Sequence, residues 1–482
     1  MEASRINRVF LNLASTGGLP PDVTTFPSLL REKAGYSTAL VGKWHLGLHC
    51  GGLLEPDFCH HPNSHGFDHF FGLPLTNVRD FGNDEVRHSS VLRPFGHLFK
   101  SLWVTILVSF VMFLWMVVKR SCGLSLLFLF VSVVLTSVVL PYHQFRAFSG
   151  VLMRNTEIVQ QPVDLLGLTE RFVSDALGFL DDQNGKSPFA LLFAFTHVHT
   201  ALIPGSRFSG KSNFGPYGDC IMEVDWSVGE VLAKINDMGL GDDTVVYFSS
   251  DNGAHQEEVM GDGSPAGGSN FPFKGGKGMG SMEGGIRVPS VIKYPKAFPR
   301  GATVDVPTSQ MDLLPTFANL AGVDIGELES VLDGKDMTAL LTGRTSKSPH
   351  DVLYHYCGTY LHGLRWIEDE KHVWKVRFAQ PRFIPGTYTC EFMCFCAPGD
   401  VEELKAPFLF NLVDDPLEDK PVSVESELYD RVMKVAKEFR RQQELHVDGN
   451  PVEDQFSLLN SMWRPWLQPC CDFGNMCSCE NS

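Results

Sequence analysis

The sequence has no excess of positive charge. Its 482 residues include 40 lysines and arginines against 56 aspartates and glutamates, which gives a net charge of −16 at pH 7. A protein that binds nucleic acid through the phosphates needs a basic patch to neutralise them. The composition therefore argues against a nucleic-acid partner. The length is sufficient for one large domain and a smaller one.

Two signals of a secreted or lumenal protein are also absent. Met1 to Ser15 contains no apolar core of the kind that a signal peptide has, and no Asn-x-Ser/Thr site for N-glycosylation occurs in the sequence. The cysteines nevertheless indicate such a compartment. Eight of the twelve lie in the last part of the chain: Cys357, Cys390, Cys394, Cys396, Cys470, Cys471, Cys477 and Cys479. Adjacent cysteines fit the Cys-x2–4-Cys spacing of zinc sites poorly, and an oxidising lumen favours disulfides, whose connectivity the sequence does not reveal.

Two long apolar segments, Leu102–Val118 and Leu124–Leu140, are separated by Lys119, Arg120 and a few small residues. Each approaches the roughly 20 residues that span a bilayer core. The alternative is a pair of buried core helices, but charge-free runs that meet at a basic tip favour a transmembrane helical hairpin. The positive-inside tendency places the basic tip in the cytosol and both flanks on the lumenal side.

The rest of the chain has an α/β pattern. Short apolar segments typical of buried parallel strands alternate with amphipathic helices, which predicts a mostly parallel sheet flanked by helices. The predicted strands are 36–41, 189–195, 245–248 and 286–291, and the predicted helices are 25–34, 168–180, 219–238 and 312–321. From about Ser346 the pattern changes to a smaller α+β subdomain, with strands predicted at 352–356, 373–378 and 407–412 and a helix at 425–444.

Polar side chains follow three of these predicted strands. Lys43 and His45 follow the first strand, His199 follows the second, and Asp251 and Asn252 follow the third. A Gly-rich loop then carries Lys274 and Lys277. Ligands of open α/β sheets bind outside the carboxyl ends of the strands. An acid and an amide offer hard oxygen ligands for a divalent cation, and lysines offer charge for an anion, so this edge is equipped to stabilise a tetrahedral oxyanion such as sulfate or phosphate.

Each part of this pattern also has an ordinary structural explanation. Gly, Asn, Asp and Lys are common in solvated loops, and a single histidine is more often structural than catalytic. Only the coincidence of all three stretches favours a site. A further group of histidines, His60, His61, His65 and His69, lies in an irregular loop and is assigned to packing or the surface rather than to a metal.

Four motifs carry a resemblance to a known family. They are GKWHLG at 42–47, HVHT at 197–200, SDNGAH at 250–255 and KGGKGMGSMEGGIRVP at 274–289. Together they resemble the sulfatase family over nearly the whole chain, and the apolar hairpin is similar to that of its steryl-sulfatase branch, which includes arylsulfatases D, E, F and H. The resemblance implies an alkaline-phosphatase-like fold and hydrolysis of aryl or steroid sulfate esters with a bound calcium ion. It also implies a membrane location facing the lumen of the endoplasmic reticulum, Golgi or lysosome.

The resemblance assigns roles position by position. Asp251 and Asn252 match calcium ligands, and Lys43, His45, His199 and Lys277 match the residues that hold the sulfate and serve its proton transfers. His199 would protonate the leaving alcohol and His45 would assist breakdown of the covalent sulfate. By the same resemblance, the expected disulfides are Cys50–Cys59, Cys357–Cys396, Cys390–Cys394, Cys470–Cys477 and Cys471–Cys479, which leaves Cys122 and Cys220 unpaired.

One part of the family pattern is missing. The family's nucleophile is a formylglycine made from the cysteine of a Cys-x-Pro-Ser-Arg motif, and this motif does not occur here. The family's first strand, with its paired aspartates, is not found either. We therefore expect a shortened member with a disturbed sheet and no turnover, for which the formylglycine-generating enzyme is a partner only in a longer form. The alternatives are a membrane-anchored pseudoenzyme that binds anions or partners, and a two-metal phosphodiesterase of the alkaline-phosphatase group.

The expected domain organisation has four parts. Residues 1–97 form the first part of the sulfatase α/β domain, 98–143 the transmembrane hairpin, 144–345 the remainder of the α/β domain, and 346–482 the C-terminal α+β subdomain with its Cys-rich tail.

Overall fold

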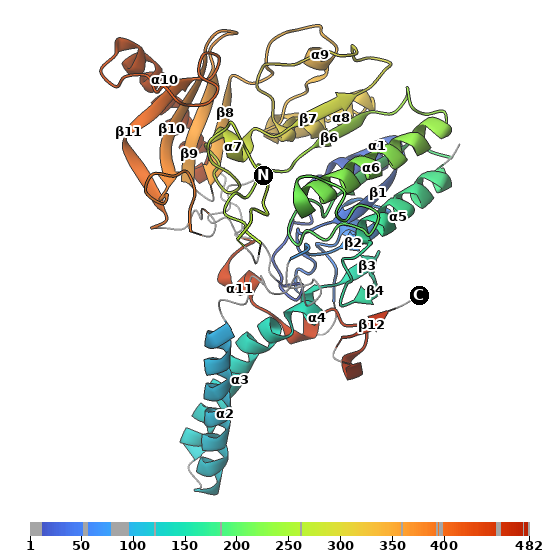
Figure 1. Cartoon of the computed structure of the whole chain (residues 1–482), viewed down its shortest axis with the longest axis vertical. Helices are drawn as coiled ribbons and strands as arrows, with labels where there is room; N and C mark the ends of the chain where they lie inside the picture. Colours follow the sequence, from blue (N-terminus) through green and yellow to red (C-terminus); the bar gives the residue numbers. More distant parts are fainter. Residues whose placement is uncertain are drawn as a thin grey trace.

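The chain forms a rounded body from which one long stalk projects (Figure 1). The computed structural model describes residues 12–51, 56–78, 96–119, 122–183, 186–260, 263–357, 360–391, 394, 399–449, 455–475 and 477–480. The main sheet has six strands in the order β12-β4-β3-β2-β1-β5. Their bounds are Ser37–Lys43 for β1, His69–Leu73 for β2, Leu152–Arg154 for β3, Glu157–Gln161 for β4, Phe189–Ala194 for β5 and Cys479–Glu480 for β12.

The sheet is mixed, and the prediction of a mostly parallel sheet is wrong. Among the described strands, the parallel pairs are β1 with β2 and β1 with β5. The hairpin of β3 and β4 continues the sheet antiparallel from β2, and β12 from the Cys-rich tail pairs antiparallel with β4. Adjacent strands joined by a tight turn pair antiparallel, whereas a parallel pair needs a long crossover such as the helices beside β1 and β5.

The strand that precedes Asp251 lies outside this sheet. β6 (Val246–Ser249) pairs antiparallel with β7 (Ser290–Lys293) in a separate two-stranded sheet, and β5 ends the six-stranded sheet. The expectation that the three site strands share a single sheet is therefore wrong for β6. The apolar side chains of the two-stranded sheet are incompletely covered, since Phe248 is 40% and Val291 65% exposed.

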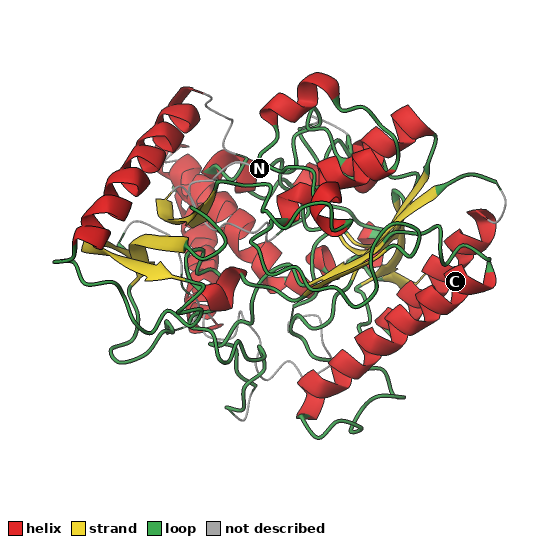
Figure 2. Ribbon diagram, turned by 90° about the horizontal axis from the view of Figure 1, so that it is seen from above, coloured by secondary structure: helices red, strands yellow, loops and turns green. Residues whose placement is uncertain are grey.

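Helices cover the main sheet on both sides (Figure 2). The longer ones are α1 (Phe26–Ala34), α5 (Leu168–Gln183), α6 (Gly215–Asp237) and α8 (Leu313–Leu320), close to the predicted spans. α1 starts at the predicted cap, because the Thr25 side chain accepts a hydrogen bond from Ser28 N–H, and it ends at Gly35 in the left-handed conformation. Buried apolar residues from β1, β2 and α5, with Phe70 and Phe172 fully enclosed, form the main core.

Several short elements connect these layers. The short α-helices are α4 (Phe145–Ser149), α7 (Glu283–Ile286), α9 (Thr338–Leu341) and α11 (Leu458–Ser461), and 3-10 helices span Pro62–His65, Gln310–Asp312, Gly326–Val331, Pro465–Leu467 and Phe473–Asn475. The strand predicted at 286–291 is wrong in its bounds. Its first residue ends α7, and only Ser290 and Val291 belong to β7, because Gly284 and Gly285 close a tight helical turn against the preceding loop.

The C-terminal part is an antiparallel sheet covered by one helix. The sheet order is β11-β10-β9-β8, with β8 at Val352–Cys357, β9 at Tyr360–Ile367, β10 at Val373–Pro381 and β11 at Val401–Asn411. Helix α10 (Glu427–Gly449) packs Val432 and Ala436 against Leu364, Val376 and Leu409 of the sheet. This arrangement agrees with the predicted α+β subdomain.

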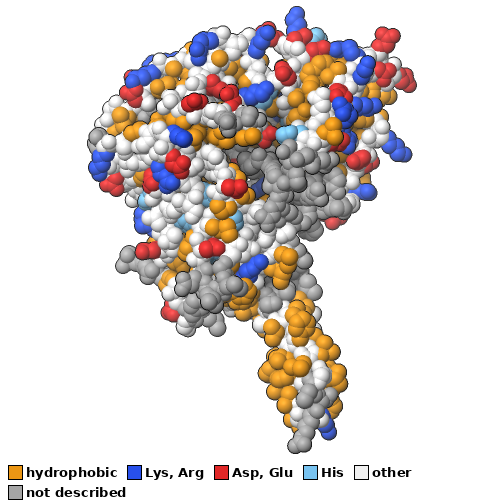
Figure 3. Space-filling view, turned by 180° about the vertical axis from the view of Figure 1, so that it is seen from behind, with side chains coloured by type: hydrophobic (Ala, Val, Ile, Leu, Met, Phe, Trp, Pro, Cys, Tyr) orange, Lys and Arg blue, Asp and Glu red, His pale blue; other side chains and the backbone are white. Residues whose placement is uncertain are grey.

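The stalk consists of two long apolar helices, α2 (Gly96–Val118) and α3 (Cys122–His143), at the predicted positions. Its surface is covered with apolar side chains (Figure 3). Among the described residues, one helix, over Ser101–Val118, is long and apolar enough to cross a membrane, with a mean hydropathy of 2.3, and a shorter apolar stretch spans Gly123–Thr136. The side chains of the first are largely exposed, so a core-helix explanation does not apply to it.

Four of the five expected disulfides are present: Cys50–Cys59, Cys390–Cys394, Cys470–Cys477 and Cys471–Cys479. Cys357 is disulfide-bonded too, and its expected partner Cys396 lies outside the described residues. Cys220 is free and buried, as expected.

Candidate active site

The first site segment is fixed by close backbone packing at the end of β1. Gly42 has a φ of +114°, and a Cβ there would lie 1.9 Å from the Ala194 carbonyl oxygen of β5, so only glycine fits. Lys43 ends the strand. The buried Trp44 then donates its indole N–H to the carbonyls of Gly47 and His60. The contacts of Gly42 and Trp44 thus fix the turn of the GKWHLG motif, which contains Lys43 and His45.

The second segment follows β5. The His199 N–H donates to the Thr196 carbonyl at 3.0 Å, and the buried Asn77 side chain donates to the His199 carbonyl at 2.9 Å. His199 Nδ1 lies 2.7 Å from the Thr200 carbonyl oxygen, so in the neutral ring Nδ1 carries the proton and donates it there. The neighbouring His197 instead pairs with the buried Glu223 at 3.2 Å, which gives it a structural role.

The third segment contains Asp251 and Asn252, and the Gly-rich loop that contains Lys277 runs beside it. Asn270 joins the two: its side chain accepts a hydrogen bond from Ala254 N–H at 2.7 Å and donates to the carbonyls of Ala254 and Gly275 at 3.0 Å. The Lys277 N–H donates to the Ala254 carbonyl at 3.0 Å.

The charges of these segments act on one another. Burial lowers the pKa of Lys43, Asp251 opposes this shift, and Lys277 adds to it. Burial and, to a lesser extent, the charges of Lys277, Lys43 and His45 lower the pKa of His199 to about 3. The structure therefore brings five of the six predicted site residues into one electrostatic group. Two lysine side chains beside this histidine suit an anionic ligand.

Lys274, in the same loop, is directed elsewhere. Its Nζ donates to the Glu418 carbonyl at 2.8 Å and pairs with the Asp419 carboxylate at 2.7 Å, both in the C-terminal subdomain. Lys274 is thus an anchor of the loop, and Lys277 is the lysine that interacts with the site.

The donor set for a hard cation is incomplete in the described part of the chain. Asp251 and Asn252 are adjacent, but among the described residues no group of three or more His, Cys, Asp or Glu ligands includes Asp251. Calcium takes six to eight oxygen ligands. The two residues can supply part of a calcium site but cannot complete one.

The histidines that follow GKWHLG are packed residues, as predicted. His49, His60, His61 and His65 are buried. His65 lies against Trp44 with ring centroids 5.7 Å apart, and His61 lies against Phe70 at 5.1 Å. His69 differs from these four in its burial. It is half-buried at the start of β2, and its Nε2 pairs with Asp175.

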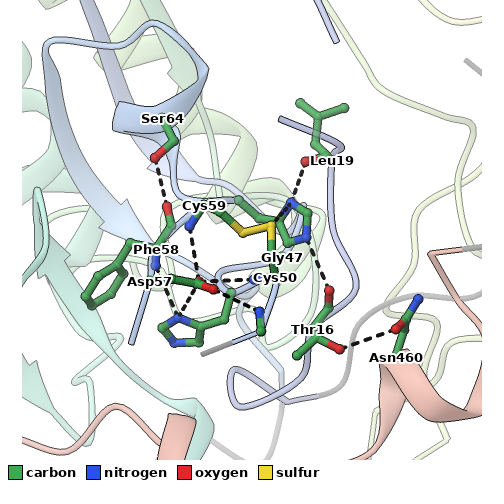
Figure 4. Close-up of a disulfide and its surroundings, with 12 residues drawn as sticks. Thr16, Leu19, Gly47, Cys50, Asp57, Phe58, Cys59, Ser64 and Asn460 are labelled. Atoms are coloured by element: carbon green, nitrogen blue, oxygen red, sulfur yellow. Dashed lines mark hydrogen bonds and ion pairs between the residues drawn. A yellow bond between two sulfur atoms is a disulfide. The ribbon is translucent and has the colours of Figure 1, made fainter. Parts of the chain in front are cut away.

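The loop that holds these rings is closed by the Cys50–Cys59 disulfide (Figure 4). The Asp57 carboxylate accepts backbone hydrogen bonds from Cys50 and Gly51 at 3.1 and 2.9 Å. Although the disulfide sulfurs lie close to His60, they are bonded to each other and are not available as metal ligands.

Three residues that support the site were not predicted. Asn77 holds the His199 segment, Asn270 holds the Asp251 and Lys277 segments together, and the Gln310 side chain donates to the Ser250 carbonyl at 2.6 Å. Each is a single amide in a segment without a recognisable motif, so the sequence carried no signal for them.

The fold and this group of residues define the chain as a sulfatase. It matches the sulfatase family over residues 3–323 and the C-terminal region of aryl-sulfatase over residues 348–479, and it therefore belongs to that family of sulfuric ester hydrolases.

Its relatives include human steryl-sulfatase, 40% identical over 481 residues that cover 98% of this chain and 81% of the relative. Human arylsulfatase H is 39% identical, over 100% of this chain and 85% of the relative. The fold matches a crystal structure of a Pseudoalteromonas sulfatase with a TM-score of 0.65 and 23% identity, covering 94% of this chain and 83% of the other. Sulfatases are generally metal-dependent.

Proposed function

We propose that the group of Lys43, His45, His199 and Lys277 binds the sulfate of an aryl or steroid sulfate ester, with Asp251 and Asn252 as part of a calcium site. The observation that supports this most directly is that the charges of Lys43 and Lys277 both act on His199, and that Asp251 and Lys277 act on Lys43. Lysine side chains grouped in this way offer charge-assisted hydrogen bonds to a sulfate monoanion. The similarity to steryl-sulfatase and arylsulfatase H supports the aryl or steroid leaving group.

The protonation of His199 follows from the ligand. In the free site its pKa of about 3 leaves the ring neutral at pH 7, so it has no spare proton for a leaving alcohol. A bound sulfate offsets the charges of Lys43 and Lys277 and so raises the pKa of His199, while burial, the larger cause of the shift, stays. The ring then takes a second proton on Nε2 more readily, and it can give this proton to the alkoxide oxygen while Nδ1 stays bonded to the Thr200 carbonyl. In a longer form that carried the formylglycine, His45 would assist breakdown of the covalent sulfate.

We infer that this polypeptide binds sulfate esters without turning them over. The covalent step of the family needs the formylglycine nucleophile, and no Cys-x-Pro-Ser-Arg motif occurs in the sequence. We further infer that α2 and α3 cross a membrane as a hairpin and that the α/β body lies in the lumen of the endoplasmic reticulum, Golgi or lysosome. The apolar exposed surface of the stalk and the disulfides of the body support this orientation.

Calorimetric titration of the detergent-solubilised chain with 4-nitrophenyl sulfate tests the proposal. Lys277→Ala is expected to weaken binding about tenfold to a hundredfold, as the loss of a charge-assisted contact does. Lys293→Ala, at an exposed lysine of β7, is the matched control and should leave affinity unchanged. Binding that is the same in both variants would contradict the site.

Two further readouts separate the parts of the proposal. Titrations in buffers of different ionisation enthalpy should show net proton uptake on binding, and this uptake should disappear in His199→Asn. Release of 4-nitrophenol by the purified parent chain at the rate of a complete sulfatase would contradict the inferred lack of turnover, even if binding behaves as expected.

A further inference from the structure

The Gly-rich loop from Lys274 to Gly285 is held between two domains. Its backbone is packed directly on other backbones: a Cβ at Gly276 would lie 2.6 Å from the Ala254 carbonyl oxygen, and a Cβ at Gly280 would lie 2.1 Å from the Tyr356 carbonyl oxygen. The first contact is on the Asp251 side, and the second is on β8 of the C-terminal sheet. The glycines have no side chains that could hold the loop in place, so the position of Lys277 depends on the groups around the loop.

A cluster of buried charges lies beneath this loop. Glu283 and Glu418 supply the carboxylates, and Lys375 and Arg377 of β10 supply the cations; the four side chains are between 0% and 4% exposed. Lys375 Nζ lies 2.8 Å from Glu283 Oε1 and 3.2 Å from Glu418 Oε1. Arg377 donates to Glu418 at 2.7 Å, and Arg365 of β9 also donates to Glu283.

The cationic side chains of the cluster act on the charge of Glu283. Burial alone raises the pKa of Glu283, but the charges of Arg365 and Lys375 reverse this shift and hold it at about 2. Burial lowers the pKa of Lys375, and the two glutamates oppose that shift. Removing one member therefore leaves an uncompensated charge inside the protein.

Glu418 connects the cluster to both ends of the loop. One carboxylate oxygen accepts the Glu283 N–H at 3.1 Å, at the end of the loop. Its backbone carbonyl accepts the Lys274 ammonium at 2.8 Å, at the start. The two ends are also bonded to each other, since the Gly284 N–H donates to the Lys274 carbonyl at 2.8 Å. Lys277 lies in the segment between these anchors.

We propose that the Glu283–Lys375–Glu418–Arg377 cluster is the positioning device for Lys277, so that the C-terminal sheet sets the affinity of a sulfate site whose ligands all lie in the other domain. The inference rests on the proposed function of that site. Buried ion pairs add little stability compared with apolar residues of the same volume. This cluster supplies a fixed geometry for the loop, which apolar packing would not supply. Glu418 is accordingly a positioning residue with no contact to substrate.

Glu418→Gln tests this because it removes the charge and keeps the shape. We expect the Kd for 4-nitrophenyl sulfate to rise about tenfold to a hundredfold, the effect of misplacing a binding group by about 1 Å. Amide hydrogen exchange should accelerate at Lys277 and Gly284. The control is Val432→Ala in α10, which destabilises the same subdomain through a cavity but does not touch the loop. Its Kd should stay within about twofold of the parent value, as for independent sites.

Asp419→Asn provides a second variant that folds even if Glu418→Gln does not. Asp419 is half-exposed and pairs with Lys274, so its loss loosens one anchor without burying a charge. We expect a smaller rise in Kd, about threefold to tenfold. Parent-like affinity in both loop variants, or an equal loss in Val432→Ala, would overturn the positioning role. Unchanged affinity in Lys277→Ala would instead overturn the sulfate site itself, and the inference with it.

Discussion

Acid should unfold this protein through the buried histidines that follow the GKWHLG turn. His49, His61 and His65 are at most 2% exposed, and burial lowers the pKa of each from 6.5 to about 4. The Asp57 carboxylate, 3.6 Å from His49, opposes the shift of that residue, and the neighbouring His60 adds to those of His49 and His65. The native loop therefore requires neutral rings, and the unfolded chain binds protons that the folded chain does not.

The magnitude follows from linkage. A pKa lowered from 6.5 to about 4 corresponds to about 3 kcal/mol for each histidine, so the three together contribute at most about 10 kcal/mol. Each histidine is a base whose pKa is lower in the folded than in the unfolded chain. Its contribution to the free energy of unfolding is therefore complete above pH 6.5 and is lost as the pH falls towards 4. Within that window the free energy of unfolding should fall by up to about 4 kcal/mol per pH unit. The loop can open locally before the whole protein unfolds, so the pH dependence of the global free energy of unfolding has this value as an upper limit.

His65→Phe isolates one histidine. Neither ring nitrogen of His65 has a hydrogen-bond partner among the described residues, and the ring lies against Trp44, so phenylalanine keeps the contact and removes the titration. Urea unfolding followed by tryptophan fluorescence at pH 7.5, 6.5, 5.5 and 4.5 should give a slope smaller by about 1.4 kcal/mol per pH unit than in the parent.

His372→Phe is the matched control. His372 also stacks on a tryptophan, Trp374, with ring centroids 5.6 Å apart, but its side chain is 44% exposed. Its ring also pairs with Asp369 at 2.9 Å in solvent, where such pairs contribute little, so its replacement should change the pH slope less than that of His65 does. A parent protein equally stable at pH 7.5 and 5, or a His65→Phe variant with the parent slope, would refute the reasoning.

Three further outcomes are expected. Gly42→Ala should prevent β1 and β5 from pairing, because its Cβ would meet the Ala194 carbonyl oxygen at 1.9 Å, and the variant should lack the parent's cooperative unfolding transition; a variant of parent stability would contradict this. Asn270→Ala should weaken binding of 4-nitrophenyl sulfate at least about tenfold, since three hydrogen bonds between the site loops are lost, and calorimetry that gives the parent Kd would exclude this role. Cys471→Ser should lower the free energy of urea unfolding by about 2–4 kcal/mol through the loss of its disulfide to Cys479, whereas an unchanged midpoint would show that β12 needs no such link.

The sequence predicted the local elements better than their arrangement. The spans of α1, α5 and β5 could be derived because caps and hydrophobic periodicity are local properties. The pairing of β6 with β7 could not be derived. An apolar run such as Val245–Phe248 specifies a strand but not its neighbour, and the antiparallel partner begins some 40 residues later.

The same distinction holds for the site. Lys43, His199 and Lys277 were identified because motifs carry them. Lys274 and Lys277 stand three residues apart in the same loop, yet they interact with different domains, and the contacts of Lys274 with Glu418 and Asp419 distinguish them. The supporting amide of Asn270 and the buried charge of Glu418 depend on contacts between distant segments, which no local pattern encodes.

The position of β12 has a consequence for how the protein is made. Its residues, Cys479 and Glu480, complete one edge of the main sheet by pairing with Gln161 and Gln160 of β4. A ribosome delivers the chain from its N-terminus at about 5–20 residues per second. The six-stranded sheet therefore stays one strand short until Glu480 has left the ribosome, with the stalk already emerged. The first domain is thus completed only after the second has been synthesised.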